Sequence, residues 1–279
     1  MVSRSIVELR EIVAHWRKHD NRVALVATMG ALHQGHLRLI EVAREHADRV
    51  VVSIFVNPSQ FAPDEDFETY PRTFDRDVEH CRSLGVELIF SPTTTEMYPS
   101  PFQTRIQVQG LGQGLCGESR PHFFDGVAIV VAKLLNIVQA DIAIFGEKDY
   151  QQLQVIRRLA QDLNIATEIV GVPTVREPDG LAMSSRNAYL TPSQRAAAVS
   201  IHDALCRARV RIAAGARDPK NVLKAIEISI EGAGGRLDYA QIVDPHNLIV
   251  IEEITTEVRL VVAAYFGETR LIDNMAAQP

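Results

Sequence analysis

Hydrophobic positions in the first part of the chain change repeatedly between helical and strand spacing. Residues 6–17 carry apolar side chains three and four positions apart, which predicts an amphipathic helix. Residues 22–28 form a short apolar run that ends in a glycine-containing turn, which predicts a strand. Residues 50–56 form a nearly continuous β-branched run, typical of a strand buried on both faces. Between these two strands, the segment after Gly35 has helical spacing.

The same alternation continues to about residue 172. Further helices are predicted over residues 73–84, 125–138 and 149–163, and further strands over residues 86–90, 141–145 and 167–172. Strand–helix alternation of this length predicts a Rossmann-like, doubly wound α/β domain with a parallel sheet. Loops with unusual polar residues follow three of the strands, after Thr28, Val56 and Phe145. Because ligands bind at the carboxyl ends of such strands, these loops mark the candidate site.

The pattern changes after about residue 175. Thr191, Pro192 and Gln194 form a strong helix start, with threonine at the N-cap, proline at the first helical position and glutamine completing a capping box. The elements expected from there are a helix to about residue 214, a helix to about residue 230, and strands over residues 237–243 and 258–264 of a small, antiparallel sheet. We therefore expect two domains, a Rossmann-like domain over residues 1–175 and a smaller α+β domain over residues 176–279.

The composition is that of an ordinary globular protein. Hydrophobic residues make up 46% of the 279 residues and charged residues 23%, and the net charge is -6. Basic residues are scattered among acidic ones, so we expect no nucleic-acid partner, which would require a basic surface. The chain start lacks the apolar core of a signal peptide, and no apolar run approaches the roughly 18 residues of a membrane span. Cys81, Cys116 and Cys206 fit no zinc or redox spacing, and we expect reduced thiols in a cytoplasmic protein without a membrane partner.

The first candidate site is the segment Thr28–His36, TMGALHQGH, where a predicted strand runs through a glycine turn into a helix start. A helix start has unpaired N–H groups and the positive end of the helix dipole, which favour phosphate. Gly35 has no Cβ, so a nucleotide can lie close to the backbone. His33 and His36 can point the same way and donate hydrogen bonds to phosphate oxygens. A metal-binding pair and two ordinary histidines are the alternative interpretations.

The second candidate site is the loop VREPDGLAMSSRN, residues 175–187. A turn at residues 178–180 precedes Ser184, Ser185 and Arg186. Two hydroxyl groups and a guanidinium suit a triphosphate, because the hydroxyls donate to its oxygens and arginine forks onto them. By itself, the segment fits an ordinary polar interdomain loop better than a ligand site.

Together, the two segments resemble the adenylate-forming nucleotidyltransferase superfamily, which includes the class I aminoacyl-tRNA synthetases. Three more motifs narrow this resemblance: SIFVNPSQF at Ser53–Phe61, YPRT at Tyr70–Thr73 and GEKDYQQ at Gly146–Gln152. In this order and spacing, the motifs resemble those of the pantothenate synthetase family, and they span most of the chain.

The resemblance implies an ATP-dependent pantoate–β-alanine ligase, an enzyme in the synthesis of a coenzyme A precursor. Pantoate and ATP would give pantoyl-adenylate and pyrophosphate, and the amine of β-alanine would then displace AMP to give pantothenate. Magnesium is expected, because the triphosphate charge needs a hard cation with oxygen ligands. The resemblance also implies a homodimer, an N-terminal domain that binds nucleotide and pantoate, and a C-terminal domain that closes over the active site.

The resemblance assigns four catalytic residues. His36 and His33 are expected to stabilise charge on the phosphates while the α-phosphorus is attacked. Lys148 and Arg186 are expected to neutralise the triphosphate. The full set expected to bind ATP is Met29, Gly30, Ala31, Leu32, His33, Gln34, Gly35, His36, Gly146, Glu147, Lys148, Asp149, Val175, Met183, Ser184, Ser185 and Arg186.

The resemblance also assigns substrate and metal residues. Gln60 is expected to hold pantoate and to help place β-alanine, with Asn57 assisting, and Gln152 is expected to bind pantoate. Asp77 resembles an acid that helps position magnesium, and a solvated charge on a helix is an equal alternative for it.

Two positions depart from the family pattern. Ala27 stands where the family usually has proline, which restores a backbone N–H and frees φ before the turn. In the segment RPHFF, His122 stands at a usual glycine and Phe123 at a usual histidine. Either His122 takes over the vacated role or the substrate pocket is more apolar.

Three other functions are alternatives to the ligase. An adenylyl- or cytidylyltransferase of the same superfamily would join the nucleotide to a phosphate, and the neutral donors Gln60 and Gln152 argue against it. An aminoacyl-tRNA synthetase would need a basic face and a tRNA-reading domain. A nucleotide-binding sensor or degenerate paralogue is favoured only by Ala27 and Phe123, and it would need no cationic cluster.

Overall fold

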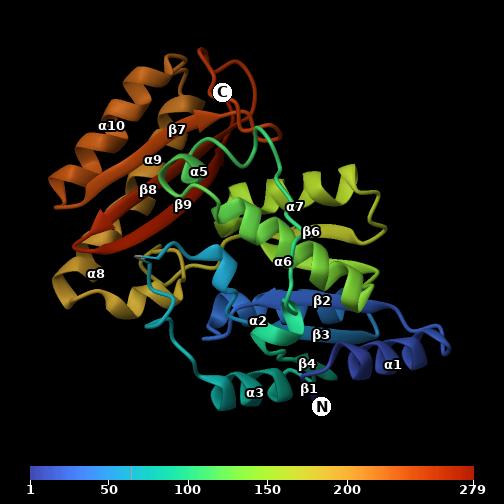
Figure 1. Ribbon diagram of the computed structural model, residues 1–279. Helices are drawn as coiled ribbons and strands as arrows, with labels where there is room; N and C mark the ends of the chain where they lie inside the picture. The colour runs from blue at the N-terminus through green and yellow to red at the C-terminus, as the bar shows by residue number, and fades with distance from the viewer. Residues whose placement is uncertain (64) are drawn as a thin grey trace. The chain divides into compact units, whose positions relative to one another are not determined.

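The computed structural model describes residues 1–63 and 65–279, which form two compact units. The first unit consists of Met1–Glu147 and Gln152–Pro173, and the second of Lys148–Gln151 and Thr174–Pro279. Figure 1 shows the first unit in blue to yellow-green and the second in yellow to red. The short segment Lys148–Gln151 belongs to the second unit although it follows a strand of the first.

The first unit is built on a parallel sheet. Among the described residues this sheet has six strands, in the order β1-β4-β3-β2-β5-β6. The strands are β1 (Val2–Ser3), β2 (Val23–Thr28), β3 (Arg49–Ile54), β4 (Leu88–Phe90), β5 (Ile142–Gly146) and β6 (Glu168–Val172). The predicted doubly wound parallel sheet is confirmed, and the two-residue strand β1 adds an edge that periodicity did not predict.

The strand order places the three polar loops next to one another. β2 pairs with β3 from Val23↔Arg49 to Thr28↔Ile54 and with β5 from Ala24↔Ile142 to Val26↔Ile144. The chain runs outward from β2 through β3 and β4, and then resumes on the other side with β5 and β6. The order therefore reverses between β2 and β5, which is where ligands bind in open α/β sheets.

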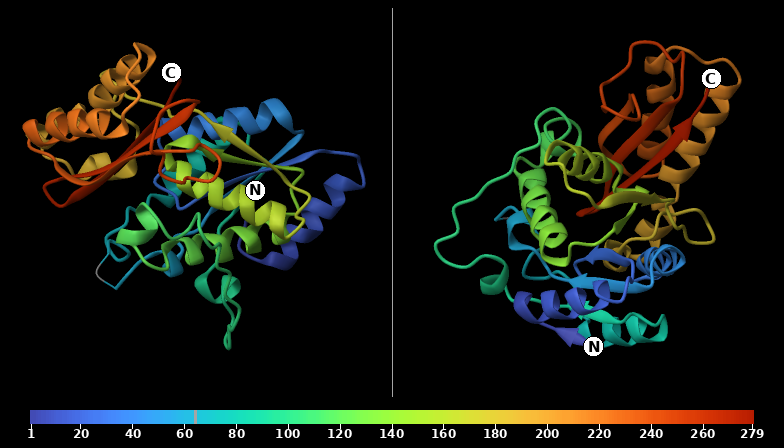
Figure 2. Two further views of the ribbon diagram at one scale, coloured as in Figure 1. Left: turned by 90° about the horizontal axis from the view of Figure 1, so that it is seen from above. Right: turned by 90° about the vertical axis from the view of Figure 1, so that its right-hand side faces the viewer.

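Helices cover both faces of this sheet (Figures 1 and 2). They are α1 (Ile6–Arg17), α2 (Gln34–His46), α3 (Phe74–Ser83), α4 (Thr94–Met97), α5 (Cys116–Ser119), α6 (Phe123–Val138) and α7 (Tyr150–Asp162). α2 packs on β2, β3 and β5, and one apolar core joins these strands to α2 and α3. α6 packs on β2 and on α1. The burial of strands on both faces explains their continuous apolar runs.

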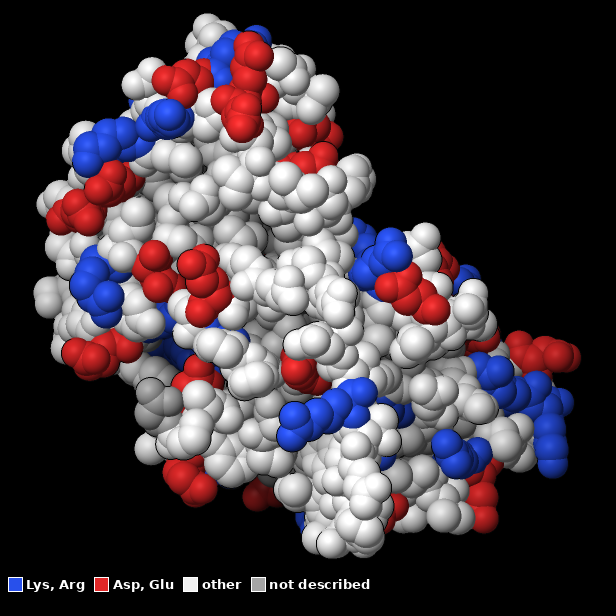
Figure 3. All heavy atoms as spheres, turned by 45° about the horizontal axis from the view of Figure 1, so that its top comes forward, with Lys and Arg blue, Asp and Glu red and all other residues white. Residues whose placement is uncertain are grey.

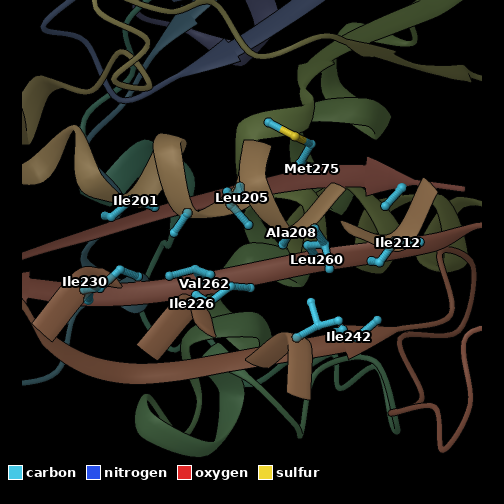
Figure 4. Close-up of a cluster of buried hydrophobic side chains, with 14 of the residues drawn as sticks. Ile201, Leu205, Ala208, Ile212, Ile226, Ile230, Ile242, Leu260, Val262 and Met275 are labelled. Carbon is cyan, nitrogen blue, oxygen red and sulfur yellow. The ribbon is translucent and has the colours of Figure 1, made fainter. Parts of the chain in front are cut away.

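The second unit is an antiparallel sheet with helices on one face. Its sheet, as far as the chain is described, consists of β7 (Arg236–Val243), β8 (Val258–Phe266) and β9 (Thr269–Ala277) in that order. Its helices are α8 (Pro192–Ala198), α9 (Ser200–Ala213) and α10 (Pro219–Gly232). Figure 4 shows side chains from α9 and α10, such as Leu205 and Ile226, against Leu260 and Val262 of β8.

Two features of the second unit differ from the prediction. The helix expected over residues 192–214 is divided at Val199, which keeps helical dihedral angles (φ -58°, ψ -26°), so α8 and α9 follow one another through a single turn residue. β9 was not predicted, because Asp273 and Asn274 interrupt its apolar pattern in the middle. The capping box at Thr191 and Gln194 is present as predicted.

The surface and the cysteines agree with the composition. On the face shown in Figure 3, basic and acidic side chains are interspersed rather than separated by sign. Cys81, Cys116 and Cys206 are free thiols, the first two buried, and burial raises the pKa of Cys81 to about 12. No helix in the described part of the chain is both long and apolar enough to cross a membrane.

Candidate active site

The turn after β2 is held by the last side chain of that strand. The Thr28 hydroxyl donates a hydrogen bond to the Ser53 carbonyl oxygen on β3 (2.7 Å) and accepts one from the Gly30 N–H (3.2 Å). Gly30 has a φ of 84°, and a Cβ there would lie 3.0 Å from a carboxylate oxygen of Asp77. The turn therefore needs glycine for its left-handed backbone and for its close approach to the acid.

Asp77 anchors this turn from helix α3. Asp77 is buried, with 1% of its surface exposed. One oxygen accepts a hydrogen bond from the Ala31 N–H (2.9 Å), and the other accepts from the Leu32 N–H (2.8 Å) and from the Thr73 hydroxyl (3.1 Å). Bonds to an ionised acceptor are stronger than neutral ones, so the acid fixes the path of the turn.

The two histidines form a capping box at the start of α2. His33 is the N-cap residue, and its Nδ1 accepts a hydrogen bond from the Gly35 N–H (3.1 Å). Nδ1 of His36 accepts one from the His33 N–H (3.3 Å), and the two ring centroids are 4.1 Å apart. Since Nδ1 is an acceptor in both rings, a neutral ring carries its proton on Nε2. An imidazole Nε2–H group is a hydrogen-bond donor of the kind that binds phosphate oxygens.

Hydrogen bonds within the protein use the backbone N–H groups that the sequence offered to phosphate. The N–H groups of residues 30–33 and of Gly35 donate to Thr28, to Asp77 and to the two imidazole rings. These five backbone N–H groups therefore already have partners within the protein.

The surroundings of Asp77 do not fit a directly bound magnesium ion. The carboxylate is buried, and both of its oxygens face hydrogen-bond donors. Mg²⁺ needs near-ideal octahedral oxygen ligation and usually keeps several waters, which a buried acid facing N–H groups does not allow. Over the described ranges, no group of three or more His, Cys, Asp or Glu side chains is arranged to hold a metal ion. The contacts of Asp77 fit an anchor of the turn.

A cavity of about 410 Å³ opens within the first unit beside this anchor. It is lined by segments that follow β1, β2, β3 and β4, including Arg4, Met29, Val56 and Ser91, and by Asp77. The cavity therefore lies at the carboxyl edge of the sheet, on the side of β1, β4, β3 and β2. Of the site residues predicted from the sequence, Met29, Gly30 and Asp77 line it.

Asn57 is locked in one orientation after β3. Its side-chain Nδ2 donates to the Gly126 carbonyl oxygen (3.0 Å), and its Oδ1 accepts from the Ser59 N–H (3.4 Å) and from the Tyr98 hydroxyl (2.8 Å). Because a backbone carbonyl accepts only and a backbone N–H donates only, the amide has one consistent orientation. Asn57 is 1% exposed, so these contacts lie within the protein interior.

The orientation of Asn57 fixes that of Gln60. The second Nδ2–H of Asn57 donates to Gln60 Oε1 (2.9 Å). The carbonyl end of Gln60 therefore faces Asn57, and its NH₂ end remains as a hydrogen-bond donor. A donor suits the oxygens of a hydroxy acid and does not suit an ammonium group. Tyr98, whose hydroxyl completes this network, was not identified from the sequence, because a tyrosine that directly follows the four-residue helix α4 has no local pattern that marks it.

The departures from the family pattern have a structural explanation. His122 has a left-handed backbone (φ 72°), a conformation that favours glycine, and its side chain is 84% exposed. Phe123 lies under the Arg120 guanidinium, 3.8 Å from the ring centroid, and Arg120 forms an ion pair with Glu65. His122 therefore does not occupy the place of the missing histidine, and an aromatic ring stacked on arginine stands there.

The segment after β5 contributes residues to both units. Gly146 ends β5, beside β2, and Glu147 begins the 3₁₀ turn that leads into α7. Gln152 is half-buried in the first turn of α7. In the second unit, Lys148 is half-buried and its ammonium lies 3.7 Å from the Asp149 carboxylate. The lysine thus has an acidic neighbour that restrains it before any ligand binds.

The loop predicted to bind triphosphate is a hairpin within the second unit. The Met183 N–H donates to the Val175 carbonyl oxygen (3.0 Å), and the Glu177 N–H donates to the Leu181 carbonyl oxygen (2.8 Å). Ser184 caps the following 3₁₀ turn, Ser185–Tyr189, by accepting from the Arg186 N–H (3.2 Å). The structure therefore brings Val175 beside Met183, the first residue of the segment 183–186.

Comparison with known proteins matches nearly the whole chain to one protein family. A family model described as pantoate-beta-alanine ligase matches residues 1–276. The pantothenate synthetase of Myxococcus xanthus is 50% identical over 277 residues, which cover 98% of this chain and 95% of that protein. The pantothenate synthetase of Pseudomonas aeruginosa is 51% identical over 275 residues, covering 98% and 97%.

Solved structures agree with the sequence comparison. The pantothenate synthetase of Thermus thermophilus has a TM-score of 0.95 and 45% identity, covering 100% of this chain and 99% of that one. The pantoate-beta-alanine ligase of Francisella tularensis, complexed with beta-gamma ATP and beta-alanine, has a TM-score of 0.84 and 35% identity, covering 99% and 97%.

Proposed function

The chain belongs to the pantoate–β-alanine ligase family and is an ATP-dependent ligase, and on that premise we propose how its residues join pantoate to β-alanine. The match over residues 1–276 carries the assignment of the reaction. In the first step the pantoate carboxylate attacks the α-phosphorus of ATP and pyrophosphate leaves. In the second step the amine of β-alanine attacks the acyl carbon of pantoyl-adenylate, and AMP leaves with the bonding electrons while the amine loses its proton.

The histidine pair is proposed to act on the phosphates. Pantoate and ATP are both anions, so their approach is costly unless fixed donors and cations offset the charge. The hydrogen bonds to Nδ1 of His33 and His36 support this role, because they place the proton of a neutral ring on Nε2 and so make that nitrogen a donor. We propose that His36 is the closer of the two to the reacting α-phosphate.

Lys148 and Arg186 are proposed to bind the triphosphate. Two things support this role: the resemblance, and the position of each residue in a short 3₁₀ turn, which restrains its backbone. Ser184 and Ser185 would add hydroxyl donors to the same phosphates. Fixed cations of this kind stabilise charge that develops on the leaving pyrophosphate.

Gln60 and Gln152 are proposed to hold pantoate. The NH₂ end of Gln60 is the donor that remains after its carbonyl accepts from Asn57. This polarity favours the pantoate oxygens as its partner in the first step. The contribution of Gln60 to placing β-alanine would then be through the carboxylate of that substrate, not through its amine.

Magnesium is proposed to enter bound to ATP. The triphosphate oxygens and water satisfy its preference for hard oxygen ligands. Asp77, the acid expected near the metal, is occupied by the turn, so we assign it no direct bond to the ion. A homodimer is proposed on the resemblance alone, and a cytoplasmic location on the sparse cysteines, which fit reduced thiols.

An omission assay tests the proposed reaction. AMP release is measured with ATP, magnesium, pantoate and β-alanine, and with each component left out in turn. We expect AMP only in the complete mixture and pyrophosphate exchange into ATP whenever pantoate is present without β-alanine. AMP release without β-alanine would indicate a different amine. ATP binding without turnover in any mixture would favour the sensor and contradict the ligase.

A further inference from the structure

Strand β9 of the second unit carries two buried polar residues side by side. Asp273 and Asn274 are each 4% exposed, although neighbouring residues of a strand point to opposite faces. Burial of polar groups is costly unless they are hydrogen-bonded, so a pair of this kind needs specific partners. The partners of this pair lie in the two segments of the second unit that are proposed to bind ATP.

Asp273 holds the base of the hairpin. Its two oxygens accept hydrogen bonds from Nη1 (2.6 Å) and Nη2 (2.9 Å) of Arg176, a bidentate ion pair. Arg176 Nη1 also donates to the Gly180 carbonyl oxygen (3.0 Å) at the tip of the same hairpin. One guanidinium therefore ties both ends of the turn to the strand, and the segment that follows it carries Arg186.

Asn274 holds the backbone of Lys148. Its Nδ2 donates to the Lys148 carbonyl oxygen (2.9 Å), and its Oδ1 accepts from Arg259 Nε (2.7 Å). The Arg259 guanidinium in turn lies over the Tyr150 ring, 3.9 Å from its centroid. Tyr150 directly follows the 3₁₀ turn that contains Lys148. Its hydroxyl donates to the Pro245 carbonyl oxygen (3.0 Å), so this side chain is held at its hydroxyl as well as at its ring.

The two residues are also coupled to each other. The Asn274 N–H donates to Asp273 Oδ1 (2.7 Å), the oxygen that accepts from Arg176 Nη2. A shift of either side chain therefore disturbs the anchor of the other. The partners are 97 and 126 residues away in the sequence, so the pair fixes segments that chain connectivity leaves independent.

We propose that Asp273 and Asn274 are positioning residues for ATP, which hold Lys148 and the Arg186 hairpin in the relative placement that the triphosphate requires. This proposal rests on the proposed roles of Lys148 and Arg186. Neither residue touches the substrate. Their effect is to fix two cations before the nucleotide arrives, so that little ordering remains to be done on binding.

A purely structural role is the alternative, and the same strand offers a matched control. Arg270 of β9 forms a buried ion pair with Asp238 of β7, with donor–acceptor distances of 2.8 and 3.0 Å. The exposed fractions of the Arg270 and Asp238 side chains are 16% and 18%, against 21% for Arg176 and 3% for Asp273. This pair joins β9 to β7. Asp238→Asn therefore removes a comparable ion pair without touching either ATP-binding segment.

Asn274→Asp is the sharpest variant. It keeps the shape and the acceptor for Arg259, but it sets a carboxylate oxygen against the Lys148 carbonyl oxygen. Arg176→Lys is the milder second variant, because lysine keeps the charge and loses the bidentate fork. Calorimetry with magnesium-ATP in the absence of pantoate gives the ATP dissociation constant, and pyrophosphate exchange gives the KM values for ATP and pantoate.

We expect Asn274→Asp to weaken ATP binding about tenfold and Arg176→Lys to weaken it about threefold, the scale of one lost charge-assisted hydrogen bond. The pantoate KM should change less than about twofold in both, and Asp238→Asn should change neither constant by more than about twofold. If all three variants lose thermal stability alike and keep wild-type ATP binding, the pair is structural and the proposal is wrong. Because calorimetry needs no pantoate, it tests the pair even if the omission assay contradicts the ligase.

Discussion

The turn at residues 28–36 and the hairpin at residues 175–186 are both expected to bind ATP, and each is held by a buried acid in a different way. In the turn, Asp77 accepts hydrogen bonds directly from backbone N–H groups. In the hairpin, Asp273 binds Arg176, and the arginine donates to a backbone carbonyl oxygen. The Asp77 anchor therefore occupies backbone N–H groups, and the Asp273 anchor occupies a guanidinium and, through it, a backbone carbonyl oxygen.

This difference decides what each region can offer a phosphate. In the turn, the N–H groups already face a carboxylate, so the histidine Nε2–H groups are the proposed donors. In the hairpin, the charge of Arg176 is neutralised by Asp273, so the proposed source of positive charge is Arg186, together with Lys148 from the segment after β5. Residue type alone does not separate Arg176 from Arg186, because the ion pair of Arg176 with Asp273 is visible in the fold and not in the sequence.

The largest expected effect is the loss of either proposed cation. Lys148→Ala and Arg186→Ala should each lower pantoate-dependent pyrophosphate exchange by about 10²–10³-fold, the scale of removing one strong electrostatic donor from an active site. Lys220→Ala, on the exposed start of α10, changes the net charge equally and should leave exchange at the wild-type rate. Wild-type exchange in Lys148→Ala or Arg186→Ala would remove that residue from the mechanism.

Asp77→Asn tests the anchor of the turn. The amide keeps one acceptor but sets an NH₂ group against a backbone N–H, so we expect unfolding to be easier by about 2–3 kcal/mol. Displacement of the histidines should lower exchange by about 10–100-fold, because small misplacements are costly in catalysis. Asp75→Asn, on the same helix, is the control. The concentration of magnesium needed for half-maximal rate should not change; a large increase at wild-type stability would instead make Asp77 a metal ligand.

A matched pair of glycines compares the two regions directly. Gly30 in the turn (φ 84°) and Gly180 in the hairpin (φ 96°) both have left-handed backbones. Alanine in this conformation costs about 1–2 kcal/mol. A Cβ at Gly180 would also lie 2.1 Å from the His202 ring, against 3.0 Å from Asp77 for Gly30, so Gly180→Ala should destabilise more. Gly30→Ala should nevertheless lose more activity, because its turn carries the histidines. Thermal unfolding and pyrophosphate exchange are measured on both variants. We expect Gly180→Ala to lose more stability and Gly30→Ala to lose more exchange activity; the same variant losing more of both would contradict the comparison.

His122→Gly provides the opposite test of the same geometry. His122 adopts a left-handed backbone without being glycine, and its exposed ring contributes little packing. Relief of the strain should raise stability by about 0.5–1 kcal/mol, with the activity unchanged. Denaturant unfolding monitors the gain. A fall in pantoate affinity in this variant would revive the hypothesis that His122 replaces the missing histidine.

The sequence predicted the elements whose apolar faces are continuous. β2, β3 and β5 are buried on both faces, so each is a nearly unbroken apolar run, and their carboxyl ends led to the candidate loops. The histidine turn was identified for the same local reason, since all of its residues are consecutive. β9 was missed because Asp273 and Asn274 interrupt its apolar pattern.

The anchors could not be predicted, because their partners are distant or lie in the backbone. Asp77 is 45 residues from Leu32, and a backbone N–H leaves no mark in the sequence. For the same reason, the orientation of Gln60 depends on the Gly126 carbonyl oxygen, which only the fold brings beside Asn57. Residue type and spacing indicated which side chains have suitable chemistry, and the fold decided which of them are already occupied.

The smallest expected effect is at the tip of the hairpin, which carries an exposed ion pair, in contrast to the buried pair of Asp273 with Arg176 at its base. The Arg195 guanidinium donates to Asp179 (2.8 and 3.1 Å) and lowers the pKa of that carboxyl below its ordinary value. A lowered pKa means that the folded state favours the ionised acid, so the pair stabilises the protein above the ordinary pKa of about 3.9. This contribution is lost as the pH falls through the lower folded-state pKa. Because Asp179 is largely exposed, we expect a coupling of only about 0–1 kcal/mol, weakened by salt. A double-mutant cycle of Asp179→Asn and Arg195→Gln, followed by denaturant unfolding at pH 7 and pH 3, measures it; a coupling that grows at the lower pH would contradict the assignment.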